Sequence, residues 1–208
     1  MLEIDLVRHG ESLFNRMGIV QGHTDSPLTD LGREQANRAG EVLRERGIRA
    51  IYTSDLARAW ETACIVGEEI GVKPVVMEGF REIRLGKWEG RPIEEIREKD
   101  SKNLELWYSC PLEARIPGAE SLEEFQKRVL NTLEEIKRKD GDGRIAIVSH
   151  GGVLSVIISC VLGLDINHLW HFRLNNASLS RVVFGYLVSR LVLLNDTCHM
   201  NGLKSTSP

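Results

Sequence analysis

The first residues of the chain alternate between apolar and acidic side chains. Acidic residues separate Leu2, Ile4 and Leu6, and this repeat of two residues predicts a strand that ends near Val7. Residues 8–28 follow no clear repeat, so we expect them to form a loop. After this loop the pattern changes to the spacing of a helix.

Two helices and two further strands are predicted between residues 29 and 77. Thr29 is a good N-cap for a helix with Ala39 and Leu43 on its apolar face, and Gly47 is placed to end it. A short strand follows at residues 48–52. A second helix is predicted from an N-cap at Ser54 to Gly71, and a third strand at residues 74–77. The order of this half is therefore strand, helix, strand, helix, strand.

The second half begins with a weaker signal and ends with a strong one. Residues 93–102 have a charged helical pattern, whereas residues 107–117 are predicted to be irregular. Ser121 and Glu124 form a capping box before a clear apolar stripe that ends near Lys139. A buried strand at 144–148, a buried helix at 151–162 and two antiparallel strands at 178–184 and 186–194 complete the prediction.

Alternating strands and helices indicate an α/β fold. We expect a three-layer α/β/α sandwich in which a mostly parallel sheet is covered on both faces, formed by residues 1–208 as one domain. Such sheets bind ligands beyond the carboxyl ends of their strands. His9 and His150 each follow a predicted strand, so both imidazoles are expected at this edge.

Composition narrows the range of partners. The chain of 208 residues carries a formal charge of -3, which gives no reason to expect binding to nucleic acid or to an anionic membrane. The four cysteines are widely spaced, the N-terminus does not resemble a leader peptide, and no apolar stretch approaches the roughly 20 residues of a membrane span. We therefore expect a cytoplasmic protein whose small anionic ligand requires a locally basic pocket.

Arg8 and His9 are the first candidates for chemistry. A neutral histidine attacks as a free base near physiological pH, and the planar guanidinium of Arg8 matches the oxygens of a phosphate. The adjacent Gly10 allows the backbone to approach a ligand closely. The alternative interpretation is that both side chains only cap a strand at the surface.

Three further residues are candidates for the same site. Arg58 lies near a predicted helix N-terminus, which attracts anions, although most helix arginines are solvated. His150 precedes two glycines and has the right chemistry to donate to a phosphoryl group, or it is a satisfied core histidine. Glu82 is a candidate general acid, or it forms a surface ion pair with Arg81 or Arg84.

Six segments together resemble a known family. They are RHGES with Asn15, QGHTDSPLTDLGREQA, YTSDLARAWETA, REIRLGKWEG, PGAES and SHGG, and they occur in the same order as in the histidine phosphatase superfamily, which has the phosphoglycerate mutase-like fold. The match spans most of residues 4–183. The resemblance implies that His9 is phosphorylated, that Arg8, Arg58 and His150 hold the phosphoryl group and that Glu82 is the proton donor. It also implies a substrate-binding set completed by Asn15, Gln21, Gly22 and Gly151, with residues 91–118 as a variable cover over the site.

The expected activity is metal-independent hydrolysis of a small phosphorylated metabolite, without a cofactor. The second ring nitrogen of His9 is expected to donate to a backbone carbonyl, which would fix its tautomer. One alternative is a cofactor-dependent phosphoglycerate mutase, but the resemblance implies a longer segment in mutases of this family than the one between Gly90 and Pro117 here. Another is a phosphate-binding module without turnover, although all the catalytic positions are retained.

Several other features leave alternatives open. His168 and His171 have no third metal ligand nearby in the sequence, so structural roles are expected for them. Trp88 is expected to pack, whereas Trp107 and Tyr108 are left between packing and substrate contact. A second substrate anion has three candidate partners, which are equally well interpreted as solvated charges: Lys99, Lys102 and Arg115. A monomer or a homodimer is expected, with the strand at 186–194 as the exposed edge.

Overall fold

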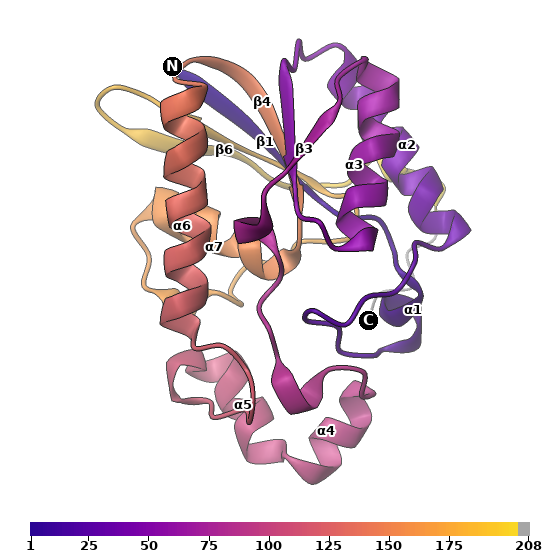
Figure 1. Cartoon of the computed structure of the whole chain (residues 1–208), viewed down its shortest axis with the longest axis vertical. Coiled ribbons are helices and arrows are strands. Elements are labelled where there is room, and N and C mark those ends of the chain that lie inside the picture. The colour runs from indigo at the N-terminus through magenta and orange to yellow at the C-terminus, as the bar shows by residue number, and fades with distance from the viewer. Residues whose placement is uncertain (204–208) are drawn as a thin grey trace.

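A single six-stranded sheet organises the molecule, and its strands run in the order β3-β2-β4-β1-β5-β6 (Figure 1). The computed structural model describes residues 1–203. The strands are β1 (Leu2–Arg8), β2 (Ala50–Thr53), β3 (Pro74–Val76), β4 (Gly143–Ser149), β5 (Leu179–Phe184) and β6 (Ser189–Asp196). The helices are α1 (Leu13–Met17), α2 (Asp30–Arg44), α3 (Ala57–Ile70), α4 (Ile93–Lys99), α5 (Ser101–Ser109), α6 (Leu122–Lys139) and α7 (Gly151–Leu162).

The sheet is mostly parallel, as the alternation of strands and helices predicts. β4 pairs in parallel with both β1 and β2, and β2 pairs in parallel with β3. Only β5 is reversed, because it pairs antiparallel with β1 on one side and with β6 on the other. The last hairpin thus extends the sheet to its β6 edge, and the expectation of a monomer or of a homodimer that uses this edge stays a prediction.

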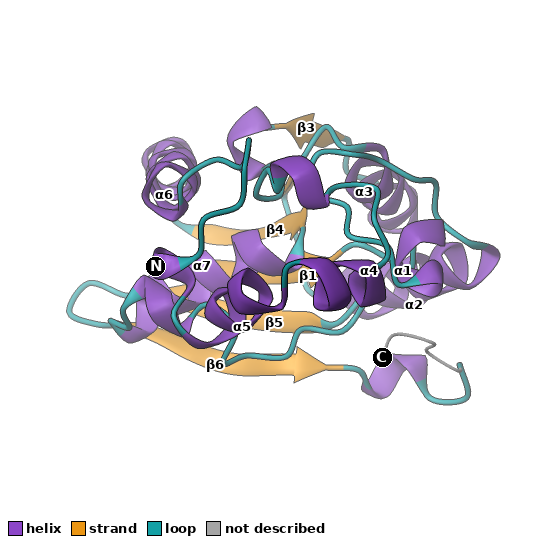
Figure 2. Cartoon of the chain, turned by 90° about the horizontal axis from the view of Figure 1, so that it is seen from below, coloured by secondary structure: helices purple, strands orange, loops and turns teal. Residues whose placement is uncertain are grey.

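Helices cover both faces of the sheet, which confirms the three-layer α/β/α architecture (Figure 2). On one face α2 and α3 pack with a buried cluster that includes Val7 and Val148. On the other face α6 and α7 pack with a larger cluster that includes Leu6 and Ile147. Neighbouring residues of β1 and β4 therefore enter opposite cores, as the two-residue repeat of a strand requires.

Two local predictions were wrong near the N-terminal half of the site. Residues 13–17 form the short helix α1 inside the predicted loop, because a Ser12–Asn15 capping box stabilises it although it buries none of its residues. Helix α3 begins at Ala57 with Leu56 as its N-cap, whereas Ser54 was expected to cap it. The Ser54 hydroxyl instead accepts from the Leu56 backbone N–H in a turn before the helix.

The segment 91–118 is more helical than its sequence predicts. Helix α4 ends at Lys99, the non-helical backbone of Asp100 breaks the helical path, and α5 then runs from Ser101 to Ser109. Trp107 and Tyr108 therefore lie on a helix, so the prediction of irregular structure was wrong for residues 107–109, whereas residues 110–117 contain only a short 3-10 turn. The Asp100 carboxylate accepts from the Trp88 indole N–H at 2.9 Å, a tertiary contact that local periodicity does not reveal.

No helix within residues 1–203 combines the length and the apolar character that a bilayer crossing requires.

Candidate active site

His9 and His150 lie together at the carboxyl edge of the sheet. Arg8 ends β1 and pairs with Ser149 at the end of β4, and the His9 backbone N–H donates to the Ser149 carbonyl at 2.9 Å. His150 follows as the N-cap of α7. The two imidazole centroids are 5.2 Å apart in an edge-on arrangement. The prediction that both histidines share this edge is confirmed.

The backbone around His9 fixes its ring. Nδ1 of His9 lies 2.8 Å from the Gly10 carbonyl, so Nδ1 carries the hydrogen and Nε2 is the nitrogen with a free lone pair. The backbone acceptor expected for this histidine is thus present. A Cβ at Gly10 would stand 2.2 Å from the Gly32 carbonyl oxygen of α2, so only glycine permits this close approach.

Two arginines flank the imidazoles. Arg58 is the second residue of α3 and only 1% exposed; its Nη1 donates to Asp25 at 3.0 Å and its Nη2 to the Gly22 carbonyl at 2.8 Å. Arg8 donates from Nη1 to the Leu174 carbonyl at 2.6 Å. Burial lowers the pKa of Arg8 to about 10 and also lowers the pKa of Arg58. Arg8 therefore remains cationic at neutral pH.

Several buried nitrogen atoms at this site lack a hydrogen-bond partner within residues 1–203. They are Nε of Arg8, Nε of Arg58 and both ring nitrogens of His150. These groups act on one another, because the charges of Arg8 and Arg58 help to lower the pKa of His150. An unsatisfied buried donor costs about 1–3 kcal/mol, so native sites concentrate such groups where a ligand satisfies them. A ligand with several acceptor oxygens, such as a phosphoryl group, fits this set.

Glu82 faces the same site from the loop after β3. Its Oε1 accepts from the Ile83 N–H at 2.9 Å and its Oε2 from the Gly152 N–H at 3.1 Å, at the positive end of α7. Its negative charge acts on both Arg8 and Arg58 and partly offsets the lowering of their pKa by burial. The alternative of a surface ion pair between Glu82 and Arg81 is wrong, because Arg81 pairs with Asp55.

Arg128 of α6 holds the backbone on which Glu82 sits. Its guanidinium donates to the carbonyls of Gly79 at 3.0 Å, Arg81 at 2.6 Å and Glu82 at 2.8 Å. Glu120 supplies the compensating charge at 2.6 Å. This arrangement ties a loop residue to a long, well-packed helix.

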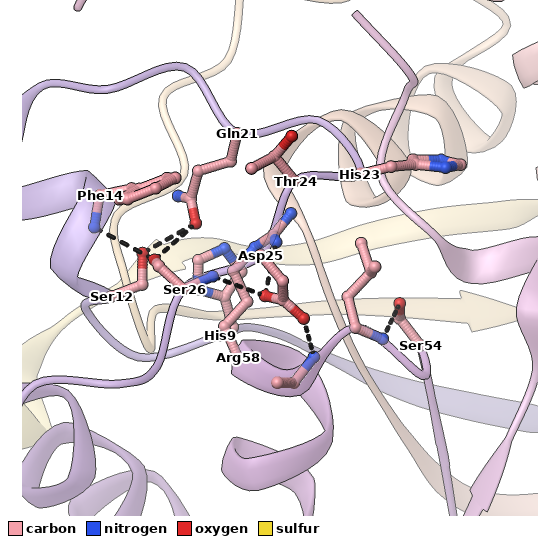
Figure 3. Close-up of polar contacts among 12 residues, drawn as sticks. His9, Ser12, Phe14, Gln21, His23, Thr24, Asp25, Ser26, Ser54 and Arg58 are labelled. Carbon is pink, nitrogen blue, oxygen red and sulfur yellow. Dashed lines mark hydrogen bonds and ion pairs between the residues drawn. The ribbon is translucent and has the colours of Figure 1, made fainter. Parts of the chain in front are cut away.

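Asn15 and Gln21 present amides toward the same region. The Asn15 amide oxygen accepts from the Ser12 backbone N–H at 3.1 Å and from Asn176 at 3.2 Å. The Gln21 amide oxygen accepts from the hydroxyls of Ser12 and Ser26 at 3.0 and 3.2 Å (Figure 3). Because the scaffold engages both oxygens, each NH₂ group is the part that can donate to an anion.

Gly22 contacts Arg58, and Gly151 lies near Arg8. Gly22 has a left-handed φ of 53°, and a Cβ there would lie 2.3 Å from Glu89 Oε1. Its carbonyl accepts a hydrogen bond from Arg58, so the backbone of Gly22 helps to position the arginine. Gly151 opens α7, where a Cβ would lie 3.8 Å from Arg8 Nε.

The structure adds residues that sequence reasoning missed. Asp25 binds both Arg58 and the Ala57 backbone N–H, which joins the loop before α2 to the start of α3 (Figure 3). Asn176 donates to the His9 carbonyl at 3.1 Å and to Asn15. Asp25 lies within a segment already singled out for its resemblance, whereas nothing in the local sequence marks Asn176.

The aromatic residues in and near the cover differ in their surroundings. Trp107 is 7% exposed and packs against Trp88 and Trp170, with ring centroids 6.3 and 5.3 Å apart. Trp88 is itself only 4% exposed, so packing is its role too. Tyr108 is 54% exposed and lines a cavity together with Arg8 and Glu82.

The candidate partners for a second anion lie away from this cavity. Lys99 pairs with Glu95, Lys102 is exposed, and Arg115 lines a different cavity. His168 and His171 have ring centroids 4.9 Å apart, and residues 1–203 contain no group of three or more potential metal ligands from His, Cys, Asp and Glu.

Acid is expected to weaken the fold through His9 and His150. Burial, and then the charge of Arg58, lower the pKa of both histidines well below the ordinary value of 6.5. Below this value the unfolded chain binds protons that the folded chain does not, so the free energy of unfolding falls as the pH falls. The slope is about 1 kcal/mol per pH unit for each histidine, measurable by urea unfolding between about pH 7 and 5.

The matched variant for this experiment is His150→Asn. It removes one of the two histidines that take up a proton on unfolding. The contribution of these histidines to the slope of the unfolding free energy against pH is therefore expected to fall by about half. An unchanged slope in this variant would show that other groups cause the acid sensitivity.

Comparison with known proteins agrees with this geometry. Residues 4–197 match the family model of the histidine phosphatase superfamily (branch 1). The putative phosphoserine phosphatase 2 of Hydrogenobacter thermophilus is 35% identical over 203 residues, which cover 98% of this chain and 100% of that protein. A probable phosphoglycerate mutase of Yersinia enterocolitica is 35% identical over 206 residues, which cover 97% of this chain and 96% of that protein.

Solved structures show the same fold. YhfR of Bacillus stearothermophilus superposes with a TM-score of 0.90 at 31% identity, covering 96% of this chain and 100% of that one. A mycobacterial glucosyl-3-phosphoglycerate phosphatase, solved with VO3, gives a TM-score of 0.86 at 29% identity, covering 94% and 99%. With a family match over nearly its whole length and relatives named as phosphatases and phosphoglycerate mutases, this chain is an enzyme of the histidine phosphatase superfamily.

Proposed function

We propose that this enzyme hydrolyses small phosphate monoesters through a phosphohistidine at Nε2 of His9, without a metal ion. The observation that carries the proposal is the set of buried, unpartnered donors of Arg8, Arg58 and His150 beside a histidine whose Nδ1–H is already held by a backbone carbonyl. These donors match the oxygens of a transferring phosphoryl group.

The first displacement transfers the phosphoryl group to the enzyme. Arg8, Arg58 and His150 bind the phosphoryl oxygens, and the lone pair of His9 Nε2 attacks phosphorus while the bond to the ester oxygen breaks. Glu82 gives its proton to the departing alcohol and becomes a carboxylate. The Gly10 carbonyl, which accepts from Nδ1–H, stabilises the positive charge that forms on the imidazole.

The second displacement returns the enzyme to its starting state. The Glu82 carboxylate takes a proton from water, whose oxygen attacks phosphorus as the bond to Nε2 breaks. Inorganic phosphate leaves, His9 is again neutral, and Glu82 is again protonated. The arginines neutralise the phosphoryl charge in both steps, which is the task that a metal ion performs elsewhere.

Hydrolysis is favoured over mutase activity by the short cover. A mutase has to keep water away from its phosphoenzyme while the substrate reorients. Here the segment between Gly90 and Pro117 contributes two short helices, α4 and α5, beyond the carboxyl edge of the sheet (Figure 1). The mutase remains the second candidate, because a similar relative is named as a probable phosphoglycerate mutase.

A direct comparison of the two activities tests the proposal. Wild-type enzyme is expected to release phosphate from a panel of alkyl and aryl monoesters, and to do so unchanged in excess EDTA, because its arginines supply the positive charge. Interconversion of 2- and 3-phosphoglycerate is followed in parallel by NMR. Efficient interconversion with little phosphate release would overturn the hydrolase assignment, and loss of activity in EDTA would overturn metal independence.

A further inference from the structure

A cavity of about 500 Å³ opens beside the phosphoryl site. Arg8, Glu82 and Gly152 belong to its lining, so an alcohol that leaves from a phosphoryl group held by Arg8 has this space beside it. Tyr108 of α5 contributes to one wall. The rest comes largely from residues 170–175, between α7 and β5, and not from residues 91–118, where the sequence placed the cover.

The size of the cavity indicates a leaving alcohol larger than a three-carbon chain. Small-molecule sites of about 300–1,000 Å³ enclose most of a ligand with many more atoms than glycerate or serine. A three-carbon alcohol would leave most of this space to water. The volume therefore favours an alcohol whose carbon skeleton is large enough to fill the cavity.

Part of the cavity lining is aromatic, and its rings pack against one another. Tyr108, Trp170 and Phe172 form this part, and the rings of Tyr108 and Trp170 lie 6.5 Å apart. Trp170 packs in turn against the buried Trp107 at 5.3 Å, which fixes the position of the wall. Aromatic faces of this kind contact planar, apolar ligand groups with little loss of side-chain entropy.

A cation lies on the same lining. Arg173 lines the cavity, and its charge reaches Arg8, where it contributes to lowering the pKa. Nε of Arg173 donates to the Asn175 side chain at 3.0 Å, and the Asn175 backbone N–H donates to Asn195 at 2.7 Å. These contacts orient the guanidinium. The phosphoryl group already has Arg8 and Arg58, so Arg173 adds positive charge beyond what that group requires.

We propose that the preferred leaving alcohol carries a planar, apolar body that packs on Tyr108, Trp170 and Phe172, and a second anionic group that pairs with Arg173. This inference rests on the proposed phosphatase function and deepens it. Arg173 then acts as a specificity-determining residue, which favours substrates with two separated negative groups over substrates with one.

Two matched substrates test this selection. The phosphate monoester of 4-(hydroxymethyl)benzoate has the anionic group, and its methyl ester is neutral at the same place, while the reacting alcohol is nearly unchanged. Wild-type enzyme is expected to prefer the carboxylate form by about 10-fold in kcat/KM, as a charge-assisted hydrogen bond provides. Arg173→Gln is expected to abolish that ratio, and Arg173→Lys to restore part of it.

The control is Arg115→Gln, which alters an exposed arginine on a different cavity and is expected to leave the ratio unchanged. The inference is overturned if the wild type hydrolyses the carboxylate and methyl ester substrates with equal kcat/KM, or if Arg173→Gln keeps the wild-type ratio of the two. In both cases the phosphatase function stands. Hydrolysis of short alkyl phosphates but of neither benzyl ester also overturns it. If no monoester of the panel releases phosphate, the proposed function itself fails.

Discussion

His9→Ala is expected to reduce phosphate release by about 10⁴-fold or more, because it removes the atom that attacks phosphorus. The surrounding donors of Arg8, Arg58 and His150 would still bind the substrate, so the loss is expected in kcat with little change in substrate binding. Steady-state kinetics and direct binding of a non-hydrolysed phosphonate analogue measure the two quantities separately.

The phosphoenzyme provides an independent readout for the same variant. Wild-type enzyme mixed with a ³²P-labelled monoester and quenched in alkali is expected to retain label in an acid-labile form, whereas His9→Ala retains none. The control is His168→Ala, which changes an exposed histidine after α7 and is expected to behave as the wild type. Normal turnover by His9→Ala, or label retained in it, would refute the assigned nucleophile.

Glu82→Gln is expected to slow hydrolysis of alkyl phosphates by about 10²–10⁴-fold, because the amide cannot protonate the departing alkoxide. The first step with 4-nitrophenyl phosphate is expected to suffer much less, since nitrophenolate leaves without a proton. The second step still lacks its base. Stopped-flow measurements are therefore expected to show a burst of nitrophenolate of about one equivalent per site, followed by slow turnover.

The matched control for this variant is Glu78→Gln. Glu78 belongs to the same loop, but its exposed carboxylate lies 3.7 Å from Arg81 and away from the site, so turnover is expected to be unchanged. Equal slowing of alkyl and nitrophenyl substrates by Glu82→Gln, without a burst, would show that Glu82 positions other groups and does not transfer a proton.

Local patterns predicted the elements that depend mainly on local forces. The capping box and apolar stripe of α6 correspond closely to the structure, because this helix buries one continuous face. The two-residue repeat of β1 also marks a strand, although helices bury both of its faces. The same patterns placed His9 and His150 at the ends of strands. Since parallel strands end at one edge, a sequence argument was enough to bring these two side chains together.

Elements that depend on contacts distant in sequence were predicted less well. Helix α3 starts at Ala57, where the carboxylate of Asp25 accepts from its first N–H, and no pattern near Ser54 signals this partner. Trp107 belongs to α5 and to the core because Trp88 and Trp170 surround it. In each of these cases the deciding partner lies in another part of the chain.

The sequence by itself determined the order of strands and helices, the edge that carries the candidate site and, through its resemblance, which side chains we propose as phosphoryl ligands. Only the tertiary structure decided how these groups are held, as the contacts of Arg128 with the Glu82 loop and of Asp25 with Arg58 show. It also decided which residues line the cavity beside Arg8 and Glu82. The physical reason is that periodicity reports which face of an element is buried, whereas a site is assembled from long-range hydrogen bonds and packing that periodicity does not encode.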